Sequence, residues 1–182
     1  MTNNTEIIAE TKQWLKDIVI GLNFCPFAKK VFDSGSIHFY VDNSENIEEC
    51  LAKLIEQCQL LDANSDIETS FILYPLILND FDDYLDFLEL ANQLLAAQNY
   101  EGVYQLASFH PQYHFENTSV DDAENYTNRS PYPMLHLLRE KSLADALKHY
   151  KDAEKIPLRN IELAQQKGAD FFISYLKSLK QK

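Results

Sequence analysis

Hydrophobic residues recur at helical spacing along three segments in the amino-terminal part of the chain, with polar residues between them. These segments are residues 7–22, 47–61 and 81–95. Each predicts an amphipathic helix, because residues three and four positions apart share one side of a helix. Gly21 can adopt the left-handed conformation that often ends a helix, so we expect the first helix to stop there.

Apolar runs between and after these segments predict strands. They are residues 37–41, 69–78 and 103–109, and the second run is apolar almost throughout, as expected of a strand covered on both faces. Strands that alternate with helices favour a mainly parallel sheet, because parallel neighbours require a crossover connection. Ligand sites in such sheets lie beyond the carboxyl ends of the strands.

The last third of the chain shows helical spacing only, in residues 134–140, 143–150, 158–167 and 171–179. A length of 182 residues suits one hydrophobic core. We therefore predict a single α/β domain over residues 1–182, with a small, mostly parallel three-stranded sheet flanked by helices and an all-helical carboxyl-terminal third.

Charge and cysteine content indicate which partners and which cellular compartment to expect. The net charge of −12 and the pI near 4.7 disfavour nucleic acid and anionic lipid, since both are bound through Lys and Arg. No apolar run approaches the roughly 20 residues that span a membrane, and the polar first residues lack the pattern of a signal peptide. The three cysteines form no Cys-x-x-Cys pair and suit reduced thiols, so the cytoplasm is the expected compartment.

Polar and titratable residues concentrate between residues 109 and 140 far more densely than a connecting loop requires. Arg129, Arg139 and His136 lie close in sequence to Asn125 and Asn128. Guanidinium and imidazolium groups suit a carboxylate or phosphate, and the asparagines would orient the bound anion. The alternative is structural: Arg139 pairs with an acidic residue, and the other side chains bond to loop carbonyls.

His110 follows the third predicted strand and precedes Pro111, which favours an extended backbone and lets the imidazole project from the strand end. His110 can act as a general base near neutral pH, or it can brace the loop through a hydrogen bond. His114 is four residues further on, but Pro111 rules out the helix interior that would bring the two rings together. We therefore expect no metal site.

Cys25 precedes Pro26, and proline is preferred at the first position of a helix, so Cys25 would cap a short helix. A thiol there faces unpaired amides and the positive end of the helix dipole, which makes Cys25 a candidate nucleophile. The alternative is packing, because free cysteines are usually buried and two phenylalanines flank this one. Cys50 and Cys58 lie near the apolar face of a predicted helix and are expected to pack in the core.

Three blocks of sequence carry a resemblance: CPFA at residues 25–28, SFHPQYHF at residues 108–115 and DDAENYTNRSPYPMLHLLRE at residues 121–140. With these blocks the chain resembles, over nearly its whole length, a bacterial family known only as a domain of unknown function, number 1415. Residues 156–160 also resemble a family stretch, which adds Arg159 and Asn160 to the candidate substrate-binding residues. The family implies no established activity, substrate or cofactor.

The expected function is that of an enzyme, a hydrolase or group transferase acting on a small anionic metabolite without a cofactor or metal. His110 would be the general acid or base, Cys25 the nucleophile, and His136 a further catalytic or anion-binding group. We expect His110, Asn128, Arg129 and His136 to surround one pocket at the carboxyl ends of the strands. The alternative is a non-catalytic module that binds a metabolite or a protein, in which the same polar cluster is structural.

Overall fold

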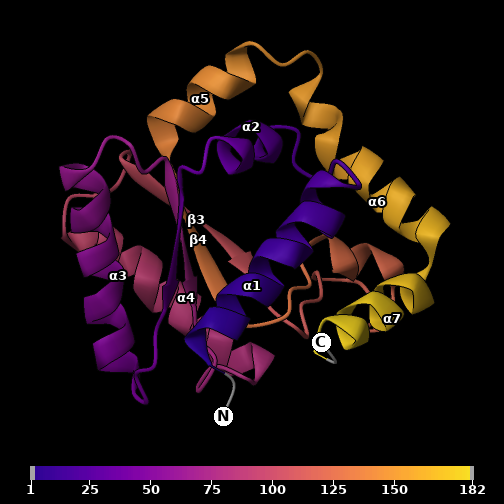
Figure 1. Cartoon of the computed structure of the whole chain (residues 1–182), viewed down its shortest axis with the longest axis horizontal. Coiled ribbons are helices and arrows are strands. Elements are labelled where there is room, and N and C mark those ends of the chain that lie inside the picture. The colour runs from indigo at the N-terminus through magenta and orange to yellow at the C-terminus, as the bar shows by residue number, and fades with distance from the viewer. Residues whose placement is uncertain (1–2, 181–182) are drawn as a thin grey trace.

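The computed structural model describes residues 3–180, which form one four-stranded sheet with helices on both faces (Figure 1). The strands are β1 (Ile37–Val41), β2 (Thr69–Leu73), β3 (Tyr104–Phe109) and β4 (Met134–Arg139). The α-helices are α1 (Asn4–Trp14), α2 (Ala28–Asp33), α3 (Ile47–Ala63), α4 (Phe81–Ala97), α5 (Glu140–Lys148), α6 (Ile156–Lys167) and α7 (Ala169–Leu179). The remaining helical segments are the π-helix η1 (Leu15–Ile20) and the short 3₁₀ segments η2 (Ala123–Thr127) and η3 (Ala153–Lys155).

The strand order in the sheet is β1-β2-β4-β3. β1 and β2 pair in parallel, while β4 lies between β2 and β3 and runs antiparallel to both. The prediction of three mostly parallel strands is therefore wrong, because residues 134–139, predicted as part of a helix, form a fourth strand. β4 packs against both cores, so hydrophobic residues occupy both of its faces with only His136 between them, and a run this short does not distinguish a strand from a helix.

Alternate residues of the two central strands enter different cores. Ile72 and Leu135 pack with α3 and α4, which cover one face of the sheet (Figure 1). Phe71 and Met134 pack with α1, η1, α6 and α7 on the other face. The sheet is thus the middle layer of three, and apolar side chains cover most of both of its faces.

Most of the other predicted elements are confirmed. The helices predicted at residues 47–61 and 81–95 are α3 and α4, each extended slightly at its carboxyl end. β1 has the predicted bounds, whereas β2 ends at Leu73. After β4 the described chain is helical in α5, α6 and α7, as expected. Among residues 3–180, no helix is both long enough and apolar enough to cross a membrane.

The first predicted helix, residues 7–22, changes character along its length. α1 gives way at Leu15 to η1, whose turns are wider than those of an α-helix. Gly21 follows η1 with φ of −62°, so the expected left-handed stop at Gly21 is wrong. Glycine is required there by close approach instead, since a methyl group on Gly21 would overlap the carbonyl oxygen of Asp17.

Gly21→Ala is expected to lower the free energy of unfolding by about 1–3 kcal/mol, the usual cost of forcing extra atoms into a filled space. Alanine ordinarily stabilises a helical position relative to glycine, so the sign of the effect is diagnostic. Urea denaturation followed by circular dichroism measures it. Equal or greater stability of the variant would show that the π-helical turn relaxes without cost.

Candidate functional site

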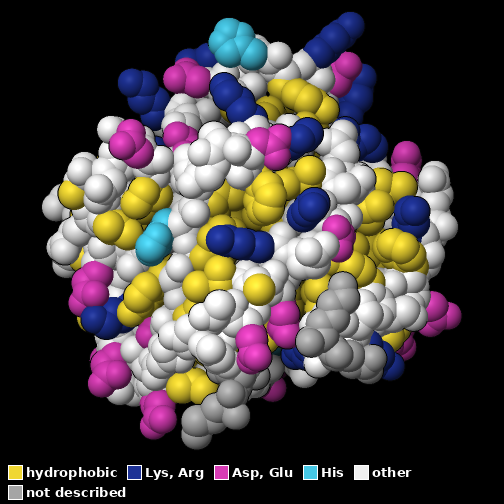
Figure 2. Space-filling view, in the orientation of Figure 1, with side chains coloured by type: hydrophobic (Ala, Val, Ile, Leu, Met, Phe, Trp, Pro, Cys, Tyr) yellow, Lys and Arg dark blue, Asp and Glu magenta, His cyan; other side chains and the backbone are white. Residues whose placement is uncertain are grey.

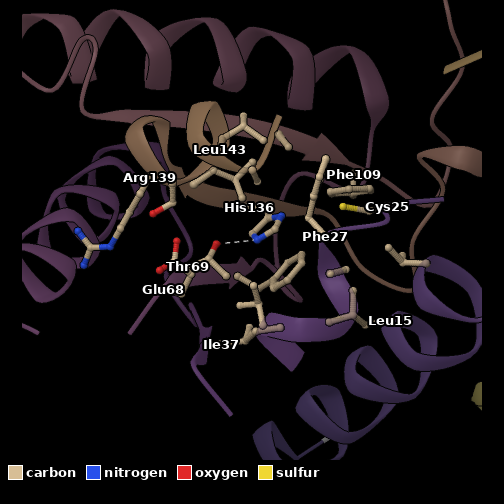
Figure 3. A pocket seen from close by; sticks show the side chains of 18 of the residues that line it. Leu15, Cys25, Phe27, Ile37, Glu68, Thr69, Phe109, His136, Arg139 and Leu143 are labelled. Atoms are coloured by element: carbon tan, nitrogen blue, oxygen red, sulfur yellow. Dashed lines mark hydrogen bonds between the residues drawn. The ribbon is translucent and has the colours of Figure 1, made fainter. Parts of the chain in front are cut away.

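A cavity of about 230 Å³ lies between the sheet and the elements α1, η1, α2 and α5 (Figure 3). Figure 2 shows hydrophobic side chains gathered in the region between α1 and α2. The wall is mostly apolar and includes Leu15, Phe27, Ile37, Phe109 and Leu143. We call it the His136 cavity, because the imidazole of His136 on β4 forms part of the wall.

The His136 cavity does not lie at the carboxyl ends of the parallel strands. Ile37 and Thr69, the first residues of β1 and β2, both line it. The antiparallel β4 causes this placement, because its carboxyl-terminal half lies beside the start of β2, where Leu138 pairs with Thr69. The cavity therefore covers the amino ends of β1 and β2 and reaches the carboxyl end of a predicted strand only at Phe109 of β3, so most of it lies away from the expected position.

The imidazole of His136 is held by a side chain from the neighbouring strand. Nε2 lies 2.7 Å from the Thr69 hydroxyl oxygen, which in turn lies 2.5 Å from the carbonyl oxygen of Leu137. A carbonyl only accepts, so the Thr69 hydroxyl donates its proton to Leu137 and accepts a hydrogen bond from Nε2–H of His136. This arrangement places a proton on Nε2, so the lone pair of the neutral ring lies on Nδ1.

Burial lowers the pKa of His136 to about 3, from an ordinary value of 6.5. The ring stacks on Phe71, its partner in the sheet register, with centroids 3.8 Å apart and planes 10° apart. Protein atoms surround the imidazole, and the part of its surface that remains accessible faces the cavity. His136 therefore stays uncharged near neutral pH and presents a hydrogen-bond acceptor.

The second ring nitrogen of His136 is available to a ligand. Within residues 3–180, the buried polar side-chain atoms without a partner are Trp14 Nε1, Asp42 Oδ2 and the Tyr74 hydroxyl. Nδ1 of His136 has no hydrogen-bond partner in that range and is not one of these buried atoms. It therefore reaches the cavity, on the side of the ring away from Thr69 (Figure 3).

Cys25 lines the same cavity, beside Phe109 (Figure 3). The prediction that Cys25 caps a helix is wrong, because α2 is only six residues long and its N-cap is Phe27. Among residues 3–180, no hydrogen bond joins Cys25 to a histidine. The structure thus brings a thiol and an imidazole to one cavity without forming a paired nucleophile and base.

Residues of α6 fix the backbone just before Cys25. Asn160 donates from Nδ2 to the Phe24 carbonyl at 2.6 Å, and Arg159 donates to the Asn23 carbonyl. Both bonds join residues 136 positions apart in sequence. Arg159 and Asn160 therefore position the Cys25 segment through its backbone.

A second cavity, of about 540 Å³, adjoins the first. The two cavities share Val19, Cys25 and Phe109 in their walls, so the thiol stands at their junction. Asn128 and Asn160, two of the candidate substrate-binding residues, line this second cavity. The sequence-predicted residues that line a cavity are thus divided between two adjoining spaces.

His110 and Asn125 are fully buried, and their side chains are hydrogen-bonded within the protein. Nε2 of His110 donates to the Leu78 carbonyl at 2.9 Å, and Nδ1 accepts from the Gln112 amide at 3.0 Å. The side chain of Asn125 makes its hydrogen bonds with residues 115–119. Burial lowers the pKa of His110, so its ring is neutral and both of its nitrogens are occupied.

The arginines bond to backbone carbonyls. Arg129 donates to two loop carbonyls and lies over the ring of Tyr126 at 4.4 Å. Arg139 donates to three carbonyls at and just beyond the carboxyl end of α3, where the helix dipole favours a cation. Arg139 lines the His136 cavity, but its guanidinium points away from the imidazole of His136 (Figure 3). Asn128 donates to the Ser108 carbonyl and thereby ties its loop to β3.

The expected convergence of four residues on one pocket is therefore incomplete. His110, Asn128 and Arg129 lie together after β3, where the backbone amide of His110 donates to the carbonyl of Asn128. The His110 ring packs against Phe81 on the α4 side of the sheet, whereas His136 faces the opposite side. No group of three or more His, Cys, Asp and Glu side chains in residues 3–180 is placed to hold a metal ion.

A family model described as a protein of unknown function, DUF1415, matches residues 6–174. The chain belongs to this family. No curated protein and no solved structure matches the chain. The family match spans the His136 cavity, the Cys25 junction and the bracing residues of α6.

Sequence reasoning misses Thr69 and Phe71, the two residues that fix the imidazole of His136. The signal in the sequence is slight: a pair of hydroxyl residues, Thr69 and Ser70, begins an otherwise apolar run. Neither has an evident role until β4 is placed beside β2. The strand pairing therefore has to be known before this part of the site can be recognised.

Cys25 is expected to be the thiol that reacts in the folded protein. Cys50 and Cys58 are fully buried, and burial raises the pKa of each thiol to about 12, so both should react only when the chain opens. Mass spectrometry after brief alkylation should find one modified thiol, absent in Cys25→Ser. Faster labelling of Cys50 or Cys58 would place Cys25 in the core instead.

The imidazole of His136 should not take up a proton between pH 8 and pH 5, since its pKa is lowered to about 3. Nitrogen NMR of the folded protein should show a protonated Nε2 and a bare Nδ1 throughout this range. The unfolded chain does protonate near its ordinary pKa of 6.5, so His136 removes stability as the pH falls from about 6.5 toward 3. Titration of the folded-state signal near pH 6.5 would contradict the buried arrangement.

Proposed function

We propose that the protein binds a small, largely apolar molecule in the His136 cavity, with a hydrogen-bond donor of that molecule bonded to Nδ1 of His136. The observation that carries this proposal is an apolar cavity containing one neutral imidazole, whose free nitrogen is held in place by Thr69 and Phe71. In such pockets the apolar wall supplies affinity, and a few placed polar groups supply orientation.

The contacts support an anionic ligand less well. The guanidinium groups of Arg129, Arg139 and Arg159 all donate to backbone carbonyls. An imidazole with a pKa of about 3 carries no charge near neutral pH, so it adds no attraction for a carboxylate or phosphate. The anion clamp expected from the sequence therefore has no free cation among these four candidate side chains.

The contacts also support binding better than catalysis. A base whose pKa is about 3 accepts a proton poorly at neutral pH, which makes His136 a weak general base. A hydrolase or group transferase that used Cys25 would need a base beside the thiol, and no histidine bonds to Cys25 in residues 3–180. The function best supported is that of a small-molecule-binding module.

Benzyl alcohol and benzyl methyl ether provide a matched test, because only the alcohol can donate a hydrogen bond. The alcohol should bind about three- to tenfold more tightly than the ether, the usual net effect of one hydrogen bond. His136→Phe should abolish that difference while leaving an apolar cavity. Ligand-observed NMR measures both affinities.

A variant that fills the cavity is the complementary control. Ala107 pairs with His136 in the sheet and lines the cavity, so Ala107→Phe should remove binding of both compounds. If that variant does not fold, Ala146→Phe fills the cavity from α5 instead. Unchanged binding of benzyl alcohol in a folded, filled variant would overturn the proposal.

A further inference from the structure

The second cavity has a different electrostatic character from the first. Its wall includes Glu116 and Glu124, and the described residues that line it include no Lys, Arg or His. Glu124 accepts a hydrogen bond from the amide of Gln165 at 2.6 Å, which leaves its charge uncompensated. Neither glutamate takes part in an ion pair within residues 3–180.

The neutral polar groups of this wall are also oriented mainly as acceptors. The hydroxyls of Thr118 and Thr127 donate their protons to backbone carbonyls. The amides of Asn128 and Asn160 each donate to a carbonyl of the adjoining backbone. The Oδ1 atom of Asn160 already accepts from Arg159, so a ligand group in this cavity meets chiefly the carboxylates of Glu116 and Glu124 and the remaining lone pairs.

We propose that the two cavities form one elongated site for an aliphatic or aralkyl primary amine, with the apolar part in the His136 cavity and the ammonium group beyond Cys25. Val19, Cys25 and Phe109 line both cavities, so the two spaces adjoin at these residues. An ammonium ion supplies the three donors that the acceptor-rich second cavity lacks. The charge preference is opposite to the anion expected from the sequence, and this inference rests on the function proposed above.

Phenylbutylamine, phenylbutanol and phenylbutyrate test this inference, because they share one apolar part and differ in the charge of the other end. Isothermal titration near neutral pH should show the amine binding about tenfold more tightly than the alcohol, with the carboxylate weakest. The Glu116→Gln/Glu124→Gln double variant should bind the alcohol as before and lose most of the preference for the amine.

The protein carries a net charge of −12, so a general attraction for cations needs its own control. The control variant Glu89→Gln/Glu101→Gln removes the same amount of charge from α4 and from the turn before β3. Glu101 lies near the start of β3, whereas the second cavity is at its other end, at Phe109. This control should keep the full preference for the amine. An equal loss of preference in both double variants would show a general charge effect and overturn the amine site.

The outcomes separate the two proposals. If phenylbutanol binds and Ala107→Phe prevents it, the His136 cavity binds apolar molecules whatever the amine does. If in that case the amine binds no more tightly than the alcohol, the amine site is wrong and the function proposed above stands. If none of the three compounds binds, both proposals fail.

Discussion

The insertion of β4 between β2 and β3 determines where the rest of the molecule can place its chemistry. In this register His136 lies beside Phe71 on one neighbouring strand and Ala107 on the other. Because side chains alternate along a strand, a shift of one residue would turn the imidazole toward α3 and α4 and leave the cavity without a polar group. A central strand is also well shielded from solvent. Burial there keeps the imidazole neutral, and its buried Nε2–H needs Thr69 as a hydrogen-bond acceptor.

The polar residues after β3 stabilise a long connection that has little regular structure. Residues 110–133 contain only the short segment η2, so their backbone groups depend on side chains for hydrogen bonds. His110 illustrates the principle: its ring bonds to the carbonyl of Leu78, a residue with φ of 62° that a leucine rarely adopts. The side chains that the sequence suggests as catalytic thus supply hydrogen bonds that order this connection and the turn at Leu78.

Local patterns predicted most of the elements, and pairing between distant segments accounts for the errors. α3 and α4 are recognisable because one side of each is polar, whereas β4 contributes hydrophobic residues to the cores on both faces of the sheet. Of the candidate residues, His136 and Cys25 do line a common cavity, but the roles of Arg129 and Arg139 depend on carbonyls that only the folded chain brings near. The sequence shows that polar side chains gather in this segment. It does not show whether each side chain bonds to a ligand or to the backbone.

The bonds from α6 to the backbone before Cys25 have a consequence for biosynthesis. The two partners are 136 residues apart, so at about 5–20 residues per second the ribosome needs between roughly 7 and 27 s to make the second after the first. Throughout that interval Asn23 and Phe24 lack the side chains that hold them, and the junction between the two cavities cannot be complete. The nascent chain therefore completes the junction between the two cavities only after nearly all of the sheet and its helices have been synthesised.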